Sequence, residues 1–306
     1  RGYHESRIGA LVEVFRLAKQ YQMEAVALTD HGNMFGAVEF YQKAIQHGIK
    51  PIVGCEVYVA PGSRFEKKTG AGEESSYHLT LLVKNEKGYY NLLKLVSLAH
   101  IEGFYYKPRV DKELLSRYPE GLIALSGCMK GEVSVFAARN DLNRAIQTAE
   151  AYRAIYGPER FYLELQNNGV ANQSLLNQRL IEIGHRLSIP LAATNDCHYL
   201  HRKDAKAHEV LLCIQTGKTM EEEQRMRFPS EEFYFKSPEE MAALFPDCQE
   251  AIWNTAAIAD QCNLEMRFGE KHIPKISVPS GETAESFLDR LAHEGLERRL
   301  ERHRED

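Results

Sequence analysis

Two short stretches of this chain carry acid and imidazole side chains directly after an apolar run. In the first, the apolar residues 25–28 are followed by Thr29-Asp30-His31-Gly32. In the second, the apolar run at 192–193 is followed by Thr194-Asn195-Asp196-Cys197-His198. Barrels and doubly wound sheets place their chemistry at such strand ends. Because carboxylates and imidazoles bind divalent metal ions, we expect both stretches to contribute to one metal site.

Other predicted strands bring residues of the same chemical types. A glutamate is embedded in the β-rich run 50–59, a histidine stands in the run 77–83, and a cysteine follows the run 121–126. In Asp196-Cys197-His198, alternate residues of an extended segment point the same way and can reach one ion together. Imidazoles, carboxylates and thiols are ligands of zinc, manganese or iron. The candidate metal ligands are His31, Glu56, His78, Cys128, Asp196 and His198.

Each candidate also has a simpler interpretation. Asp30 can cap the turn that follows it while His31 bonds to backbone. Glu56 can be an inward charge on an edge strand, Cys128 a small buried apolar group, and His78 a half-buried imidazole. His78 fits the site least well, because it lies at the beginning of its apolar run. The occurrence of several such residues near strand ends of one α/β domain favours the metal site.

The hydrophobic periodicity predicts strands that alternate with helices over roughly the first 200 residues. Such alternation is typical of a parallel sheet or barrel. A helix opens the chain and feeds a buried strand, so an earlier strand is expected upstream of residue 1. Strands are predicted at 25–28, 50–59, 77–83, 121–126, 161–165 and 189–193, and helices at 8–21, 36–47, 85–100, 139–156, 172–187, 201–216, 246–262 and 282–304.

An aromatic and basic loop, Gly103 to Arg109 (GFYYKPR), follows one of the predicted helices. Arg109 could hold a phosphate through its planar guanidinium, and Tyr105 or Tyr106 could stack on a base. A surface loop that packs on itself is the alternative.

The composition is that of an ordinary soluble globular protein, with 306 residues, 43% hydrophobic and 26% charged. The formal net charge of −5 gives no global attraction to a polyanion, so nucleic-acid contact needs local basic patches or metal ions. The six cysteines never form C-x-x-C, which argues against a zinc knuckle or redox pair. No apolar run approaches the length of a bilayer span, and we expect a cytoplasmic protein without membrane contact.

Several stretches together resemble the polymerase and histidinol phosphatase (PHP) domain at the N-terminus of bacterial replicative DNA polymerase III alpha subunits. The resemblance covers essentially residues 7 to 306, and 276–299 is similar to the segment that joins that domain to the polymerase palm. The stretches that carry it are LTDHGNMFGAVEFYQKAIQHGIKPIVGCEVYV at 28–59, YHLTLLV at 77–83, ALSGC at 124–128 and ATNDCHYL at 193–200.

The resemblance implies a distorted seven-stranded (βα) barrel with its first strand missing from this chain, followed by a C-terminal helical connector. The expected domains are a metal-binding barrel with a helical appendage at 1–272, and a linker and helix at 273–306 leading toward a polymerase palm. Asp30 would orient the metal ligands. A complete site would hold up to three divalent ions (zinc, manganese, iron or magnesium), and the family's metal positions fall here on the six candidate ligands. Asp196 and His198 are also the expected catalytic residues, and Arg109 is added to them for its phosphate-binding chemistry.

The implied activity is metal-dependent phosphodiester hydrolysis of the 3′-5′ exonuclease type. The implied partners are DNA, the proofreading exonuclease subunit, other replicase subunits and the remainder of a polymerase chain. Two alternatives stay open: a non-catalytic module that docks the proofreading subunit, and a free-standing phosphatase for a small phosphomonoester. The family opens with a strand carrying H-x-H that residues 1–6 do not match, since His4 stands alone. We expect that strand to be omitted from the chain as given.

Overall fold

The computed structural model describes residues 8–68, 74–270, 274 and 276–305. Residues 1–7, on which the expectation about His4 and the H-x-H strand falls, lie outside the described residues. The chain divides into two compact units, one ending at Met266 and the other starting at Arg267. Among the helices that the structure describes, none is long and apolar enough to cross a membrane.

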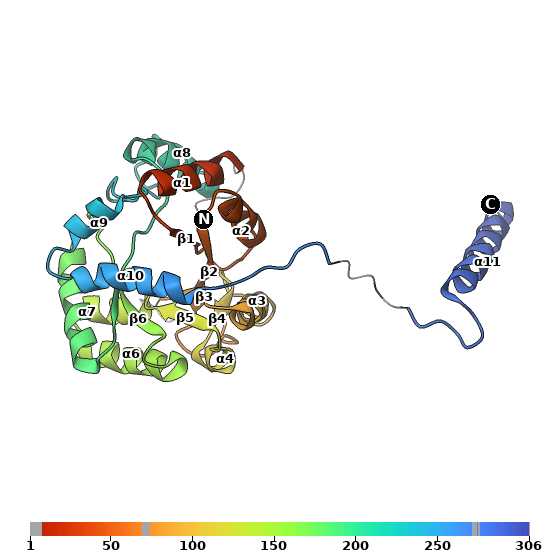
Figure 1. Cartoon of the computed structure of the whole chain (residues 1–306), viewed down its shortest axis with the longest axis horizontal. Helices are drawn as coiled ribbons and strands as arrows, with labels where there is room; N and C mark the ends of the chain where they lie inside the picture. The colour runs from red at the N-terminus through yellow and green to blue at the C-terminus, as the bar shows by residue number, and fades with distance from the viewer. Residues whose placement is uncertain (1–7, 69–73, 271–273, 275, 306) are drawn as a thin grey trace. The chain divides into compact units, whose positions relative to one another are not determined.

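The first unit is built on a mixed sheet that curls on itself, with helices around it (Figure 1). The strand order is β1-β2-β3-β5-β6-β7, and the short β4 pairs with the end of β2. This is the architecture of a distorted (βα) barrel. The strands are β1 (Ala25–Leu28), β2 (Lys50–Val59), β3 (Tyr77–Val83), β4 (Arg109–Val110), β5 (Leu122–Leu125), β6 (Phe161–Leu165) and β7 (Leu191–Ala193).

Ten α-helices and one short 3₁₀ helix are described in the first unit, and one helix in the second. Those of the first unit are α1 (Ile8–Gln20), α2 (Ala37–Gln46), α3 (Glu86–Ile101), α4 (Lys112–Arg117), α5 (Glu132–Ala138), α6 (Leu142–Tyr156), α7 (Gln173–Leu187), η1 (Arg202–Asp204), α8 (Ala205–Thr216), α9 (Pro238–Leu244) and α10 (Gln249–Gln261). The second unit contains α11 (Ala284–Glu305).

The six strands expected from the sequence are present, but the sheet is not wholly parallel. Strand β3 runs antiparallel to both of its neighbours, β2 and β5. A parallel neighbour requires a crossover, usually through a helix, and no helix is found among the described residues between β2 and β3. Four short elements were not expected from periodicity, because each is too short to show a repeat: β4, α4, α5 and α9.

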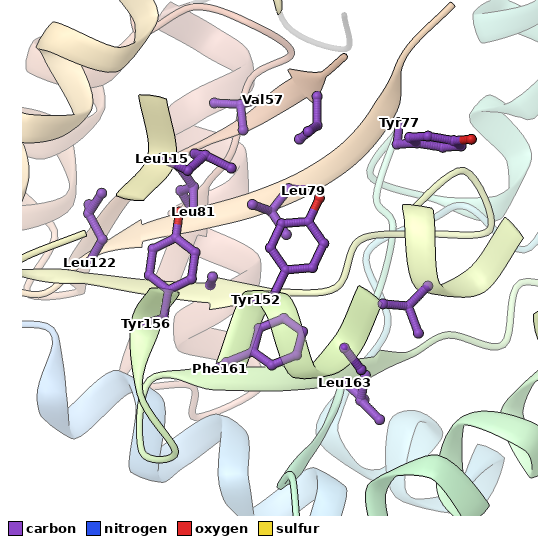
Figure 2. Close-up of a cluster of buried hydrophobic side chains, with 14 of the residues drawn as sticks. Val57, Tyr77, Leu79, Leu81, Leu115, Leu122, Tyr152, Tyr156, Phe161 and Leu163 are labelled. Carbon is purple, nitrogen blue, oxygen red and sulfur yellow. The ribbon is translucent and has the colours of Figure 1, made fainter. Parts of the chain in front are cut away.

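One face of the sheet packs against the surrounding helices. Because side chains alternate along a strand, Tyr77, Leu79 and Leu81 of β3 all point to this face. Here they meet fully buried residues of the helices, among them Tyr152 and Tyr156 of α6 (Figure 2). This cluster forms the main hydrophobic core of the unit.

The other face of the sheet changes character along its length. At one end its side chains are apolar, with Ile52, Leu82 and Ile123 packing against Ile258 and Cys262 at α10 and its C-terminal end. At the other end the same alternating positions carry buried polar side chains, which are Glu56, Thr80, Glu164 and Gln166. Burying such groups is costly unless they are paired, so this polar end needs a specific explanation.

A substitution at Gly127 tests how tightly the turn after β5 is packed. Its φ is +82°, and a Cβ built there would lie 2.6 Å from the carbonyl oxygen of His78. Gly217 has a φ of +65° with no atom within 4 Å of a built Cβ, which makes it a matched control. We expect Gly217→Ala to lower the free energy of unfolding by about 1 kcal/mol through backbone strain alone. Gly127→Ala adds steric overlap and should lower the free energy of unfolding, measured in urea, by about 2–4 kcal/mol. Equal decreases in the two variants would contradict the close approach at Gly127.

Candidate metal centre

Three of the predicted ligands converge at the polar end of the sheet. One donor atom from each of His31, Glu56 and His78 lies within 4.8 Å of the other two. The Nδ1 atom of His31 is 2.8 Å from Oε1 of Glu56, and Nδ1 of His78 contacts the same oxygen. All three side chains are largely shielded from solvent, with exposures between 12% and 21%. Their geometry is that of a small, partly buried ligand cluster.

Backbone pairing explains why these three residues meet. His31 follows β1 and forms a parallel bridge with Glu56, whose N–H donates to the carbonyl of Asp30. Strand β3 runs antiparallel to β2 with His78 opposite Tyr58 and Thr80 opposite Glu56. The start of β3 therefore lies at the C-terminal end of β2. This reversal accounts for the position of His78 at the beginning of its apolar run.

The donor set fits a divalent cation. Oε1 of Glu56 and Nδ1 of His31 are buried, yet neither has a hydrogen bond of acceptable geometry. Burial alone would raise the pKa of the Glu56 carboxyl, but the neighbouring His78 and His31 imidazoles lower it well below its usual range. A carboxylate kept ionised beside two imidazole nitrogens offers the ligand types that zinc, manganese or iron bind.

Cys128 borders the same cluster. Its Sγ lies 3.5 Å from Nδ1 of His78, and the turn that carries it is tied to β3 by the hydrogen bond from the His78 N–H to the carbonyl of Lys130. Burial raises the pKa of the Cys128 thiol well above its ordinary value, and the charges of Glu56 and Asp196 raise it further. A thiolate at this position would need a cation beside it.

Asp196 and His198 form a second pair near the cluster. Oδ1 of Asp196 is 3.1 Å from Nε2 of His198, and the ring centroids of His198 and His31 are 6.4 Å apart. Both residues line a cavity of about 400 Å³ together with Asp30, His31 and Glu56. The structure thus brings the predicted ligands to one end of the sheet, although only three form a tight donor set among the described residues. Coordination by the other three stays a prediction, as does the orienting role of Asp30.

Arg109 does not lie at this centre, and the expectation that it holds a phosphate is corrected. It is among the largest fully buried side chains of the protein. Its guanidinium donates to the backbone carbonyls of residues 64, 66, 75 and 103. With its donors used in this way, Arg109 fastens two loops together and has a structural role.

Sequence reasoning missed Glu164, which lies on β6 and is buried beside the cluster. Its carboxylate accepts four hydrogen bonds, from Thr194 and Thr80 hydroxyls, the Gln166 amide and the Gly127 N–H. It also lines the cavity described above. An acid inside the apolar run FYLEL is the same signal that singled out Glu56, so it could have been found.

The pKa of Glu164 is raised to about 7. Burial is the largest cause, and the hydrogen bond from Thr194 opposes it. The negative charges of Glu56 and Asp196 also contribute to the increase. Glu164 therefore links strands β3, β5 and β7 from the middle of the polar end, next to the residues that carry the predicted ligands.

Comparison with known proteins identifies the class. Residues 7–168, more than half of the chain, match the model of the PHP domain. The chain therefore belongs to the PHP domain family.

Its relatives include the DNA polymerase III subunit alpha of Thermus aquaticus, which is 46% identical over 90% of this chain and 23% of its own length. The same subunit of Borreliella burgdorferi is 43% identical over 93% of this chain and 25% of its own length. The chain thus spans about a quarter of the curated relatives it matches. Among solved structures, a proposed metal-dependent phosphoesterase from Bifidobacterium adolescentis gives a TM-score of 0.38 at 12% identity, covering 62% of this chain and 82% of that one.

The raised pKa of Glu164 makes the folding stability depend on pH. Its pKa is about 7 in the folded protein and close to 4.5 when unfolded, so the folded state retains the proton more strongly. Its contribution to stability is therefore complete below about pH 4.5 and is lost as the pH rises through 7. Between pH 4.5 and 8, in EDTA, the free energy of unfolding should fall by up to about 3 kcal/mol more in the native protein than in the Glu164→Gln variant.

The Glu164→Gln variant is the reference for this comparison. Its side chain is neutral at every pH, so any destabilisation that the substitution causes does not depend on pH. The measurement is urea unfolding of both proteins at several pH values. Parallel profiles would show that the carboxyl of Glu164 does not titrate in this range.

Proposed function

We propose that the chain is the PHP domain of a bacterial DNA polymerase III alpha subunit and hydrolyses phosphodiester bonds of DNA with divalent metal ions, in the manner of a 3′-5′ exonuclease. The observation that carries this proposal is the convergence of the donor atoms of His31, Glu56 and His78 at strand ends of a PHP domain. The names of the relatives support the placement in a replicative polymerase.

The side chains would divide the work as follows. His31, Glu56 and His78 would bind one ion, and Cys128, Asp196 and His198 would extend the site around it. A divalent ion supplies Lewis acidity, which makes water nucleophilic at neutral pH and neutralises charge on phosphate oxygens. Zinc, manganese or iron suit the imidazole and thiol donors better than magnesium does.

Asp196 fixes the imidazole of His198. The 3.1 Å contact joins its Oδ1 to Nε2 of the ring, so the proton belongs on Nε2 and the lone pair on Nδ1. The rings of Phe228 and Phe233, with centroids 4.6 and 5.7 Å from that of His198, limit its movement. His198 is thereby held in one tautomer and one orientation.

The proposed partners follow from the polymerase relatives. They are DNA, the proofreading exonuclease subunit, other replicase subunits and the remainder of the polymerase chain, in the cytoplasm. Helix α11 supports further contacts, because Leu288, Leu291, Leu296 and Leu300 are 41% to 67% exposed. This observation also favours a second function, in which the chain braces and docks other parts of the replicase. No observation favours the free-standing phosphomonoesterase.

A matched pair of double variants tests the hydrolytic function. Asp196→Ala with His198→Ala should lower hydrolysis of 3′-labelled single-stranded DNA by about 100-fold or more, because two ligands are removed together. The control is Asp289→Ala with His293→Ala on α11, which removes an exposed acid–imidazole pair whose atoms are 3.5 Å apart. Metal content is measured on the same samples.

Four outcomes are informative. Loss of activity and metal in the first variant but not in the control supports the proposal. Undiminished DNA degradation by the first variant would show that these residues are not the site. A native protein that binds metal without cleaving DNA would favour the docking function, and cleavage of a simple phosphomonoester alone would favour the phosphatase.

A further inference from the structure

The loop formed by residues 104–108, here called the aromatic loop, lies against the metal centre. Gly32, directly after His31, has no room for a side chain, because a Cβ there would lie 2.9 Å from Cγ of Pro108 and 3.0 Å from the ring of Tyr58. The Tyr58 ring is in turn 6.3 Å from His31 and 5.2 Å from His78, measured between ring centroids. The loop is therefore separated from the ligand imidazoles by one aromatic ring.

A lysine of this loop contacts the aromatic ring that borders the centre. The ammonium of Lys107 lies 5.6 Å from the centroid of the Tyr58 ring, on which the cation is held by the ring's negative face. This contact fixes a positive charge near a site that contains the carboxylates of Glu56 and Asp196. Lys107 is thus the basic side chain of this loop that is available for the phosphate-binding role expected of Arg109.

Two aromatic side chains of the loop face solvent. Tyr106 is 75% exposed and Phe104 is 53% exposed. Tyr106 also has a φ of +57°, which is unfavourable for a residue with a side chain. The hydrogen bond from the Tyr105 N–H to the carbonyl of Lys107 closes the turn around it. The Tyr106 ring is therefore exposed to solvent on a residue whose backbone conformation is strained.

The backbone beneath these side chains is firmly anchored. The guanidinium of Arg109 donates to the carbonyl of Gly103 and lies 5.0 Å from the Tyr105 ring, and Lys67 donates to the carbonyl of Phe104. Binding would therefore require little ordering of the loop, which favours affinity. Exposed rings on a fixed backbone, next to a lysine, form a stacking platform of the kind that binds single strands.

We propose that the aromatic loop binds the single-stranded DNA that enters the metal centre, with Lys107 contacting a backbone phosphate and Tyr106 stacking on a base. This inference rests on the proposed function for its choice of ligand. A phosphodiester strand that extends from the metal centre past the Tyr58 ring would meet the Lys107 ammonium and the exposed ring of the adjacent Tyr106. Paired bases are already stacked on each other, so an exposed tyrosine ring selects single strands over duplex.

The experiment measures binding of fluorescent oligothymidylate to the chain by anisotropy, in EDTA so that no hydrolysis occurs. Tyr106→Ala should weaken binding about tenfold, and Tyr106→Phe should retain it, because stacking needs the ring and not the hydroxyl. Lys107→Gln should reduce the slope of log affinity against log salt by about 0.7, the value for one phosphate contact with a single strand.

Matched controls come from α3, which starts beyond the opposite end of β3 from His78. Lys87 and Tyr90 are an exposed lysine and tyrosine on that helix, and Lys87→Gln and Tyr90→Ala should leave affinity and salt slope unchanged. Unfolding in urea checks that every variant is folded.

Three results would overturn the proposal: no binding by the native chain, native affinity in both loop variants, or equal losses in the α3 controls. Equal affinity of the native chain for duplex DNA would also contradict the selection of single strands. Failure of the proposed function would give a different result. The native chain would bind the oligonucleotide in EDTA but would not cleave it after metal is added back. Where cleavage is observed, Tyr106→Ala should raise KM and leave kcat unchanged, whereas loss of kcat alone would contradict a binding role.

Discussion

The antiparallel pairing of β2 with β3 is the constraint on which the metal centre depends. It places Tyr58 opposite His78 and Glu56 opposite Thr80, so that a residue at the start of one strand meets a residue near the end of the other. A parallel β3 would carry His78 to the far end of the sheet. The parallel bridge between His31 and Glu56 then adds the third donor from the neighbouring strand end.

The buried polar groups at one end of the sheet lower the folding stability and provide the candidate metal ligands. Buried carboxylates at Glu56 and Glu164 repel each other, and burial favours the neutral form of each. Glu56 stays ionised because two imidazoles approach it, whereas Glu164 keeps a raised pKa despite four hydrogen bonds. A cation at the centre would reduce this repulsion, so metal binding and folding stability are coupled here. The apolar end, closed by α10, supplies the packing that supports this arrangement.

Much of the architecture could be predicted from sequence because it rests on local patterns. Apolar runs located the six longer strands, and acids or imidazoles at their ends located most of the polar end. The direction of β3 could not be read locally, since it depends on the connection through residues 60–76, and this is why His78 looked misplaced. The prediction that Arg109 holds a phosphate was wrong because a basic residue in an aromatic loop has the same sequence signal whether it is exposed or buried. Only the fold shows that its donors are used by backbone carbonyls.

The central claim is that His31, Glu56 and His78 bind a divalent ion. Anomalous X-ray diffraction from crystals of the protein grown with manganese or zinc measures this directly. The account predicts an anomalous peak about 2.0–2.3 Å from Nδ1 of His31, Nδ1 of His78 and Oε1 of Glu56. Ordered side chains with no peak between them, or a peak only at a distant surface group, would contradict it.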